Sequence, residues 1–105
     1  MTQIPDSMIQ IDIPFDMLRE ICLRYEVGEL ALFGSVLSKD FRNDSDVDVL
    51  VEFKPDAQIG FLALLRMQRE LAAIFRHPVD LVPKAGLKPK IRQEVLSTMK
   101  VLYAS

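Results

Sequence analysis

The sequence has few of the residues on which several common kinds of site depend. Its 105 residues include one cysteine, one histidine and no tryptophan. One cysteine and one histidine are too few for a thiolate zinc site or a Cys–His catalytic pair. Neither the GxxxxGK[ST] pattern of a P-loop nor a GxSxG nucleophile elbow is present. These absences direct attention to the carboxylates.

The composition also bears on partners and compartment. The net charge of −2 gives no reason to expect direct binding of nucleic acid or of an anionic membrane. No apolar run is long enough to span a bilayer, and the N-terminus lacks the pattern of a signal peptide. A single cysteine suits a reducing compartment, so we expect a cytoplasmic protein. The apolar content of 50% hints at an interface in a homo- or hetero-oligomer.

The spacing of apolar residues predicts the order helix, strand, strand, helix, strand, helix. The expected ranges are about residues 14–27, 29–33, 47–53, 60–76, 79–82 and 89–100. In the long helix, the residues expected to face inward are Phe61, Leu64, Leu65, Leu71, Ala72 and Phe75. We therefore predict an α/β (α+β) fold, a small mixed sheet with helices packed against it. Residues 1–105 are expected to form a single domain in which residues 1–12 are a loosely ordered lead.

Two short motifs lie about ten residues apart. Gly34 and Ser35 close an apolar run, where glycine permits a sharp turn and serine offers donors to an anion. Ser35 could also cap a following helix. Asp46 and Asp48 open the second strand on one face, with Cα atoms roughly 6.6 Å apart. Two carboxylates this close favour a cation between them, and Mg²⁺ binds such pairs together with phosphates.

A third acid stands in the next predicted strand. Asp80 lies between Val79 and Leu81, and alternation places its side chain opposite those two core-facing residues. An aspartate near a strand end often only faces water. Beside a metal pair, however, it could bind the catalytic metal and help to deprotonate an attacking hydroxyl.

At these residues the chain resembles the minimal nucleotidyltransferase (MNT) family of the DNA polymerase β-like nucleotidyltransferase superfamily. The family pattern is hG[GS], about ten residues, Dx[DE] on a strand and a third acid on a later strand. Gly34 and Ser35, Asp46 and Asp48, and Asp80 match it, within a likeness that runs from about residue 13 to residue 103. Many members carry an arginine shortly after Gly-Ser, where this chain has Leu37-Ser38-Lys39.

The resemblance implies the nucleotidyltransferase fold and transfer of AMP from ATP. It implies that Asp46, Asp48 and Asp80 are catalytic and hold one or two Mg²⁺ ions, and that Gly34 and Ser35 bind the nucleotide. Many such proteins are antitoxins that silence a HEPN-type ribonuclease toxin by adenylylating a tyrosine, so a protein partner is expected. Two alternatives stay open: a non-catalytic module that neutralises its partner by contact, and a domain whose acids only hold a structural cation.

Overall fold

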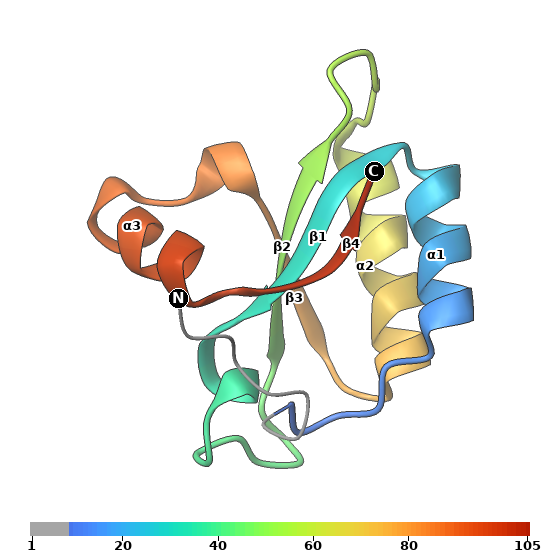
Figure 1. Cartoon of the computed structure of the whole chain (residues 1–105). Coiled ribbons are helices and arrows are strands. Elements are labelled where there is room, and N and C mark those ends of the chain that lie inside the picture. The colour runs from blue at the N-terminus through green and yellow to red at the C-terminus, as the bar shows by residue number, and fades with distance from the viewer. Residues whose placement is uncertain (1–8) are drawn as a thin grey trace.

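A mixed four-stranded sheet with helices on both faces forms the described part of the chain (Figure 1). The computed structural model describes residues 9–105. The helices and strands are α1 Phe15–Arg24, β1 Val27–Phe33, β2 Val47–Phe53, α2 Phe61–Phe75, β3 Val79–Pro83, α3 Pro89–Thr98 and β4 Lys100–Ala104. Two 3-10 turns, η2 Gly34–Leu37 and η3 Lys84–Gly86, follow β1 and β3. None of the helices in residues 9–105 has the length and apolar character needed to cross a bilayer.

The strands lie in the order β3-β2-β1-β4. Strand β1 is antiparallel to both neighbours, whereas β2 and β3 are parallel, which confirms the predicted mixed sheet. Strand β4 was not predicted, because the last helix was expected to run to Lys100. The helix ends at Thr98, Met99 is extended, and residues 100–104 pair with β1, with Tyr103 opposite Leu30.

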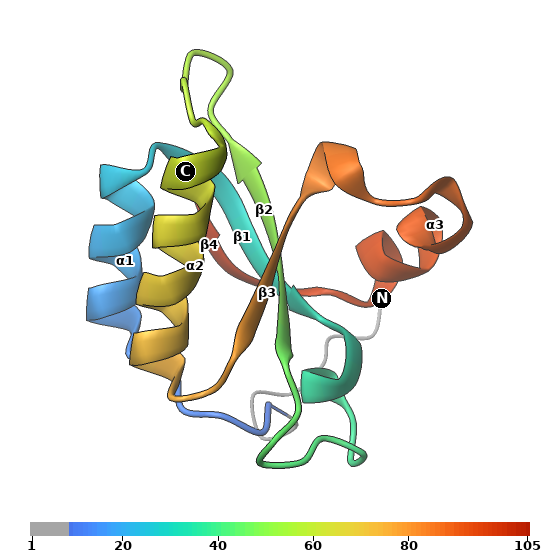
Figure 2. The same cartoon turned by 180° about the vertical axis from the view of Figure 1, so that it is seen from behind.

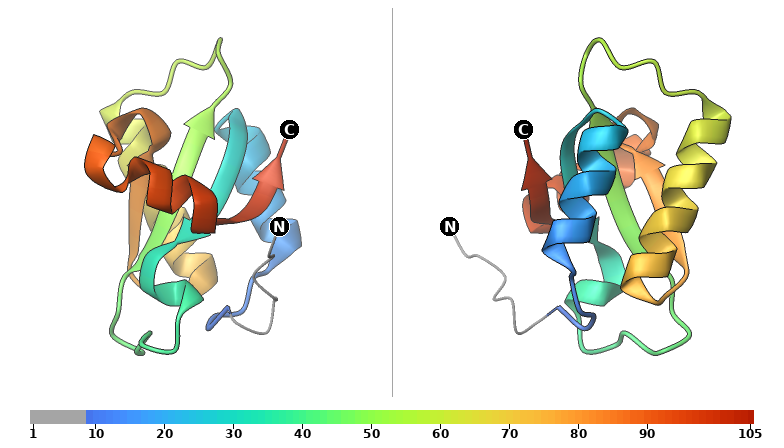
Figure 3. Two further views of the ribbon diagram at one scale, coloured as in Figure 1. Left: turned by 60° about the vertical axis from the view of Figure 1, so that its left-hand side comes forward. Right: turned by 90° about the vertical axis from the view of Figure 1, so that its right-hand side faces the viewer.

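Helices α1 and α2 cover one face of the sheet and α3 covers the other (Figures 2 and 3). Along β2, Val47, Val49 and Val51 are buried in the main core with the side chains of α1 and α2. Leu50 belongs to a smaller cluster on the opposite face with Val95 of α3. The predicted alternation along this strand is therefore confirmed, and it places Asp48 on the α3 side of the sheet.

The ends of the elements differ from the prediction at several places. Of the expected lead over residues 1–12, residues 1–8 lie outside the described residues and residues 9–12 form no helix or strand. Helix α1 ends at Arg24 and the chain turns at Glu26 with φ of 56°, so that β1 begins at Val27. The expectation for α2 was wrong at Phe61 and Leu65, which are 68% and 36% exposed. The buried residues of α2 are Met67, Leu71 and Phe75, which confirms the expectation for Leu71 and Phe75.

Candidate functional site

The turn after β1 is built around Gly34. Its φ of 77° lies in the left-handed region that side chains rarely adopt. A Cβ atom at this position would also overlap Oδ2 of Asp48. Glycine therefore meets two needs at once, the backbone turn and the room for the carboxylate of the neighbouring strand.

The strand pairing brings the predicted acids together. In the parallel pair β2–β3, Asp48 stands directly opposite Asp80, so both side chains lie on the same face. The antiparallel pair β1–β2 places Phe33, which precedes Gly34, opposite Asp48. Asp46 lies immediately before β2. The end of β1 and the starts of β2 and β3 thus meet at one end of the sheet, where Asp46, Asp48 and Asp80 lie beside the turn that contains Gly34 and Ser35.

The electrostatics of Asp48 reflect this gathering. Its side chain is half-buried, whereas Asp46 and Asp80 are exposed. Burial raises the pKa of Asp48, and the nearby charges of Asp80 and Asp46 raise it further. A cation among the three carboxylates would reverse the repulsive part of this effect.

The loop that delivers Asp46 is held by local hydrogen bonds. Ser45 N–H donates to the carbonyl of Arg42 at 3.0 Å, and Arg42 N–H donates to Ser45 Oγ at 3.1 Å. This is the turn that Asp, Asn and Ser residues favour before a strand. At its far end, Val47 N–H donates to the carbonyl of Pro78 at 2.8 Å, which ties the entry of β2 to the entry of β3.

Ser35 has a different place from the one expected for a helix cap. The turn η2 already begins at Gly34, with Phe33 at the cap position and no side-chain cap bond, so Ser35 lies inside the turn. Its carbonyl accepts hydrogen bonds from Ser38 N–H at 2.9 Å and Ser38 Oγ at 3.1 Å. Ser38 Oγ in turn accepts from Asp40 N–H at 3.2 Å. Ser38, singled out in the sequence only because many relatives have arginine nearby, therefore closes the turn itself.

The acids fit an ion that needs only a few protein ligands. Among the described residues, no three His, Cys, Asp or Glu side chains are already arranged to hold a metal together. Mg²⁺ usually takes one or two carboxylates and completes its shell with water and substrate phosphates. Half-buried Asp48, flanked by Asp46 and Asp80, is an oxygen-donor set of that kind. The metal site of Asp46, Asp48 and Asp80 stays a prediction that this donor chemistry supports.

Three further titratable side chains, those of His77, Glu52 and Cys22, make contacts that account for them structurally. His77 lies after α2, where its Nδ1 is 3.0 Å from the carbonyl of Phe75 and its ring contacts Phe41. Glu52 is 3.7 Å from Lys84 Nζ, which is also 4.0 Å from Glu29. Cys22 is fully buried, and burial raises its pKa to about 12, so it is an inert core residue.

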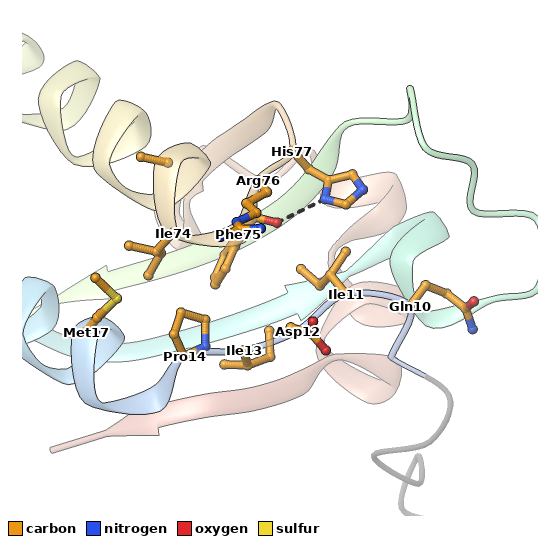
Figure 4. Close-up of a pocket in the computed structure, with 11 residues that line it drawn as sticks. Gln10, Ile11, Asp12, Ile13, Pro14, Met17, Ile74, Phe75, Arg76 and His77 are labelled. Carbon is orange, nitrogen blue, oxygen red and sulfur yellow. Dashed lines mark hydrogen bonds between the residues drawn. The ribbon is translucent and has the colours of Figure 1, made fainter.

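A cavity of about 690 Å³ lies between the segment before α1 and the C-terminal end of α2 (Figure 4). It is lined by residues 10–14, by Met17 at the start of α1 and by residues 73–77 at the end of α2. None of the five predicted site residues lines it. The predicted site therefore lies at the end of the sheet where the strand ends meet, and not in this cavity.

The sequence pattern of the nucleotidyltransferase domain family matches residues 16–102, and the chain belongs to that family. It is 36% identical over 78 residues to the protein adenylyltransferase MntA of Thermococcus cleftensis, covering 74% of this chain and 77% of that protein.

Solved structures share the fold. A toxin–antitoxin structure with AMP-PNP superimposes with a TM-score of 0.70 at 20% identity, covering 89% of this chain and 75% of that one. A complex of a tri-AMPylated Shewanella oneidensis HEPN toxin with an MNT antitoxin gives 0.62 at 20% identity, covering 87% and 70%. The expected nucleotidyltransferase fold is confirmed.

Proposed function

We propose that this protein transfers AMP from ATP to the hydroxyl group of a residue, expected to be a tyrosine, on a partner protein. We also propose that it is the antitoxin of a HEPN-type toxin. The observation that carries the proposal is the meeting of Asp46, Asp48 and Asp80 beside the turn at Gly34. The likeness to a protein adenylyltransferase supports the same reaction. The toxin–antitoxin complexes that share its fold support the partner.

Each site residue has a role that follows from its place. Gly34 and Ser35 offer backbone and hydroxyl donors to the β- and γ-phosphates. Asp46 and Asp48 would hold one or two Mg²⁺ ions, and Asp80 would complete that site from the neighbouring strand. The bound metal would supply positive charge that neutralises the triphosphate and stabilises the attacking and leaving oxygens.

The reaction is a displacement at the α-phosphorus. The hydroxyl oxygen of the acceptor forms the new bond to phosphorus while the bond to pyrophosphate breaks, and the hydroxyl proton passes to Asp80 or to water. Asp80 suits this part because it is exposed and stands opposite Asp48. Most of the catalytic effect comes from positioning and charge stabilisation, which few residue types can supply.

A partner protein would supply the acceptor hydroxyl, and it needs a surface on which to dock. Two apolar side chains on the first turn of α2, Phe61 and Leu62, are 68% and 69% exposed, and such exposure is typical of surfaces that meet a protein partner. We further propose the cytoplasm as the compartment, since it supplies ATP and keeps a lone thiol reduced.

The test is incubation of the protein with the product of the neighbouring gene, Mg²⁺ and α-labelled ATP, followed by intact mass measurement of both chains. We expect the partner to gain the mass of one or a few AMP groups and to lose its nuclease activity. Asp46→Asn with Asp48→Asn should abolish the gain, whereas Asp56→Asn, in the exposed turn after β2, should not.

The complex itself provides the control for the alternative. The double Asp→Asn variant should still bind the partner but should no longer silence it. A variant that silences its partner without transferring AMP would instead identify a module that acts by contact, and the enzymatic account would fail.

A further inference from the structure

Strand β3 carries Asp80 at the edge of the sheet, bonded to β2 on one side only. An edge strand leaves its outward N–H groups without a strand partner, and it is held less firmly than a central one. The N–H of Leu81, the residue after Asp80, points to this outer edge. It donates a 2.9 Å hydrogen bond to the side-chain Oε1 of Gln68 on α2. The side-chain oxygen of Gln68 thus accepts the hydrogen bond that a neighbouring strand would otherwise accept from Leu81.

Gln68 is well placed to hold the strand in one position. It is half-buried and stands next to Met67, which is fully buried in the core with Leu71 of the same helix. The packing of α2 therefore fixes the backbone of Gln68. The hydrogen bond from Leu81 N–H to Gln68 in turn restrains the backbone of β3 at Leu81. Because β3 spans only Val79–Pro83, a restraint at Leu81 acts on the peptide that carries Asp80.

We infer that Gln68 is a positioning residue, which holds Asp80 opposite Asp48 through the Leu81 N–H. The inference rests on the proposed function, in which Asp80 completes the metal site and receives the acceptor's proton. It adds a residue outside the Gly-Ser and acidic motifs, one that touches neither nucleotide nor acceptor. Displacement of a catalytic group by about 1 Å can cost a hundredfold in rate, so a single restraint of this kind matters.

The hydrogen bond requires an acceptor oxygen, and this requirement defines the variants. Gln68→Met keeps the length and apolar stem of the side chain but removes the acceptor. Gln68→Glu keeps an oxygen at the same place. Gln93→Met, on the exposed side of α3, is the matched control for the same chemical change. All four proteins are compared at a temperature at which thermal unfolding shows them fully folded.

Three measurements are made on each protein. The first is the amide exchange rate of Leu81 by NMR, which reports the hydrogen bond itself. The second is the affinity for Mn²⁺ alone, used as the probe for the acidic site. The third is the rate of AMP transfer to the partner, with kcat and the KM for ATP determined separately.

Gln68→Met should speed Leu81 exchange by roughly tenfold or more and weaken Mn²⁺ binding by about tenfold. It should lower kcat by about tenfold and leave the KM for ATP within about twofold, because Gly34, Ser35 and Asp46 are untouched. Gln68→Glu should restore kcat to within about threefold of the parent. Gln93→Met should change none of these quantities.

The inference is overturned if Gln68→Met frees the Leu81 amide but leaves Mn²⁺ affinity and kcat unchanged. It is equally overturned if Leu81 exchange does not respond, since the hydrogen bond would then hold nothing. If the parent protein transfers no AMP at all, the proposed function fails, and Mn²⁺ affinity alone decides whether Gln68 positions the acidic site.

Discussion

At the scale of single residues, Gly34 joins the fold to the chemistry most directly. Its hydrogen atom faces the carboxylate of Asp48, and its φ is positive. Gly34→Ala should cost about 1–2 kcal/mol of unfolding free energy, because an L-residue is strained in the left-handed region. It should also lower AMP transfer by at least about tenfold, because the new methyl group displaces Asp48. Chemical unfolding and the transfer assay measure the two effects.

Gly86→Ala is the matched control for that change. Gly86 ends η3, and a Cβ atom there would have no neighbour within 4 Å. The control should keep full activity and nearly unchanged stability. An equal loss of activity in both alanine variants would mean that the contact between Gly34 and Asp48 is irrelevant.

At neutral pH and without metal, the ionised carboxylate of Asp48 should lower the stability of the folded protein, although the proposed function requires it. Its pKa is raised in the folded protein by burial and by Asp80 and Asp46, so folding favours its protonated form. The stability that it contributes is therefore greatest at acid pH and falls as the pH rises through the raised pKa. At neutral pH without metal, Asp48→Asn should raise the melting temperature while abolishing transfer.

Two conditions check this expectation for Asp48→Asn. The gain in melting temperature should vanish below about pH 3.9, where the carboxyl of the parent protein is protonated. Added Mg²⁺ and ATP should stabilise the parent protein and not the variant, since only the parent retains the site. A lower melting temperature for Asp48→Asn at neutral pH would contradict the electrostatic account.

Much of the site could be predicted from single residues. The alternation of valines and aspartates in β2 was enough to place Asp48 on a polar face, and the short spacing to Gly34 pointed to a turn beside it. Gln68 could not be found in this way, because a glutamine within a helix is usually a solvated residue. Its importance comes from a strand edge that exists only after the sheet has formed.

At the scale of elements, α1 and α2 are joined by a polar cluster on their outer side. Tyr25 Oη and Arg24 Nη1 both donate hydrogen bonds to the carboxylate of Glu70. Both hydrogen bonds lower the pKa of Glu70, and the bond from Tyr25 has the largest effect. The cluster supplements the apolar contacts of the two helices and is partly open to solvent.

Tyr25→Phe should cost about 1 kcal/mol at neutral pH through the lost hydrogen bond. Because the pKa of Glu70 is lowered, its contribution is complete above the usual carboxyl range and is lost as the pH falls through the lowered pKa. The difference between parent and variant should therefore shrink at about pH 3. Urea unfolding at both pH values measures it, with Tyr103→Phe on β4 as the control. A pH-independent difference would point to packing instead of the carboxylate.

The elements themselves were predicted unevenly. Strand β2 agrees with its expected range, and α2 differs by one residue at each end. The inward orientation of Phe61 and Leu65 failed, because the apolar residues of α2 cover more than one face and only packing selects the buried one. Strand β4 was missed for a related reason. Five residues carry little periodicity, and their pairing depends on β1, which is far away in the sequence.

At the scale of the whole molecule, the two faces of the sheet have separate tasks. The face under α1 and α2 contains most of the buried residues and stabilises the fold. The other face is covered over part of its area by α3, with a small apolar cluster, and carries Asp48. Since the acids lie where the strands begin on this second face, a large acceptor can approach them without disturbing the main core.

The place of β1 in the sheet has a consequence for how the protein is made. Its partner β2 follows closely in the chain, but its other partner, β4, with Tyr103 opposite Leu30, is synthesised much later. While the ribosome is still adding roughly seventy residues, the apolar strand β1 has one bare edge. During that interval a nascent chain is most exposed to pairing with another copy of itself, and arrival of the last strand ends the risk.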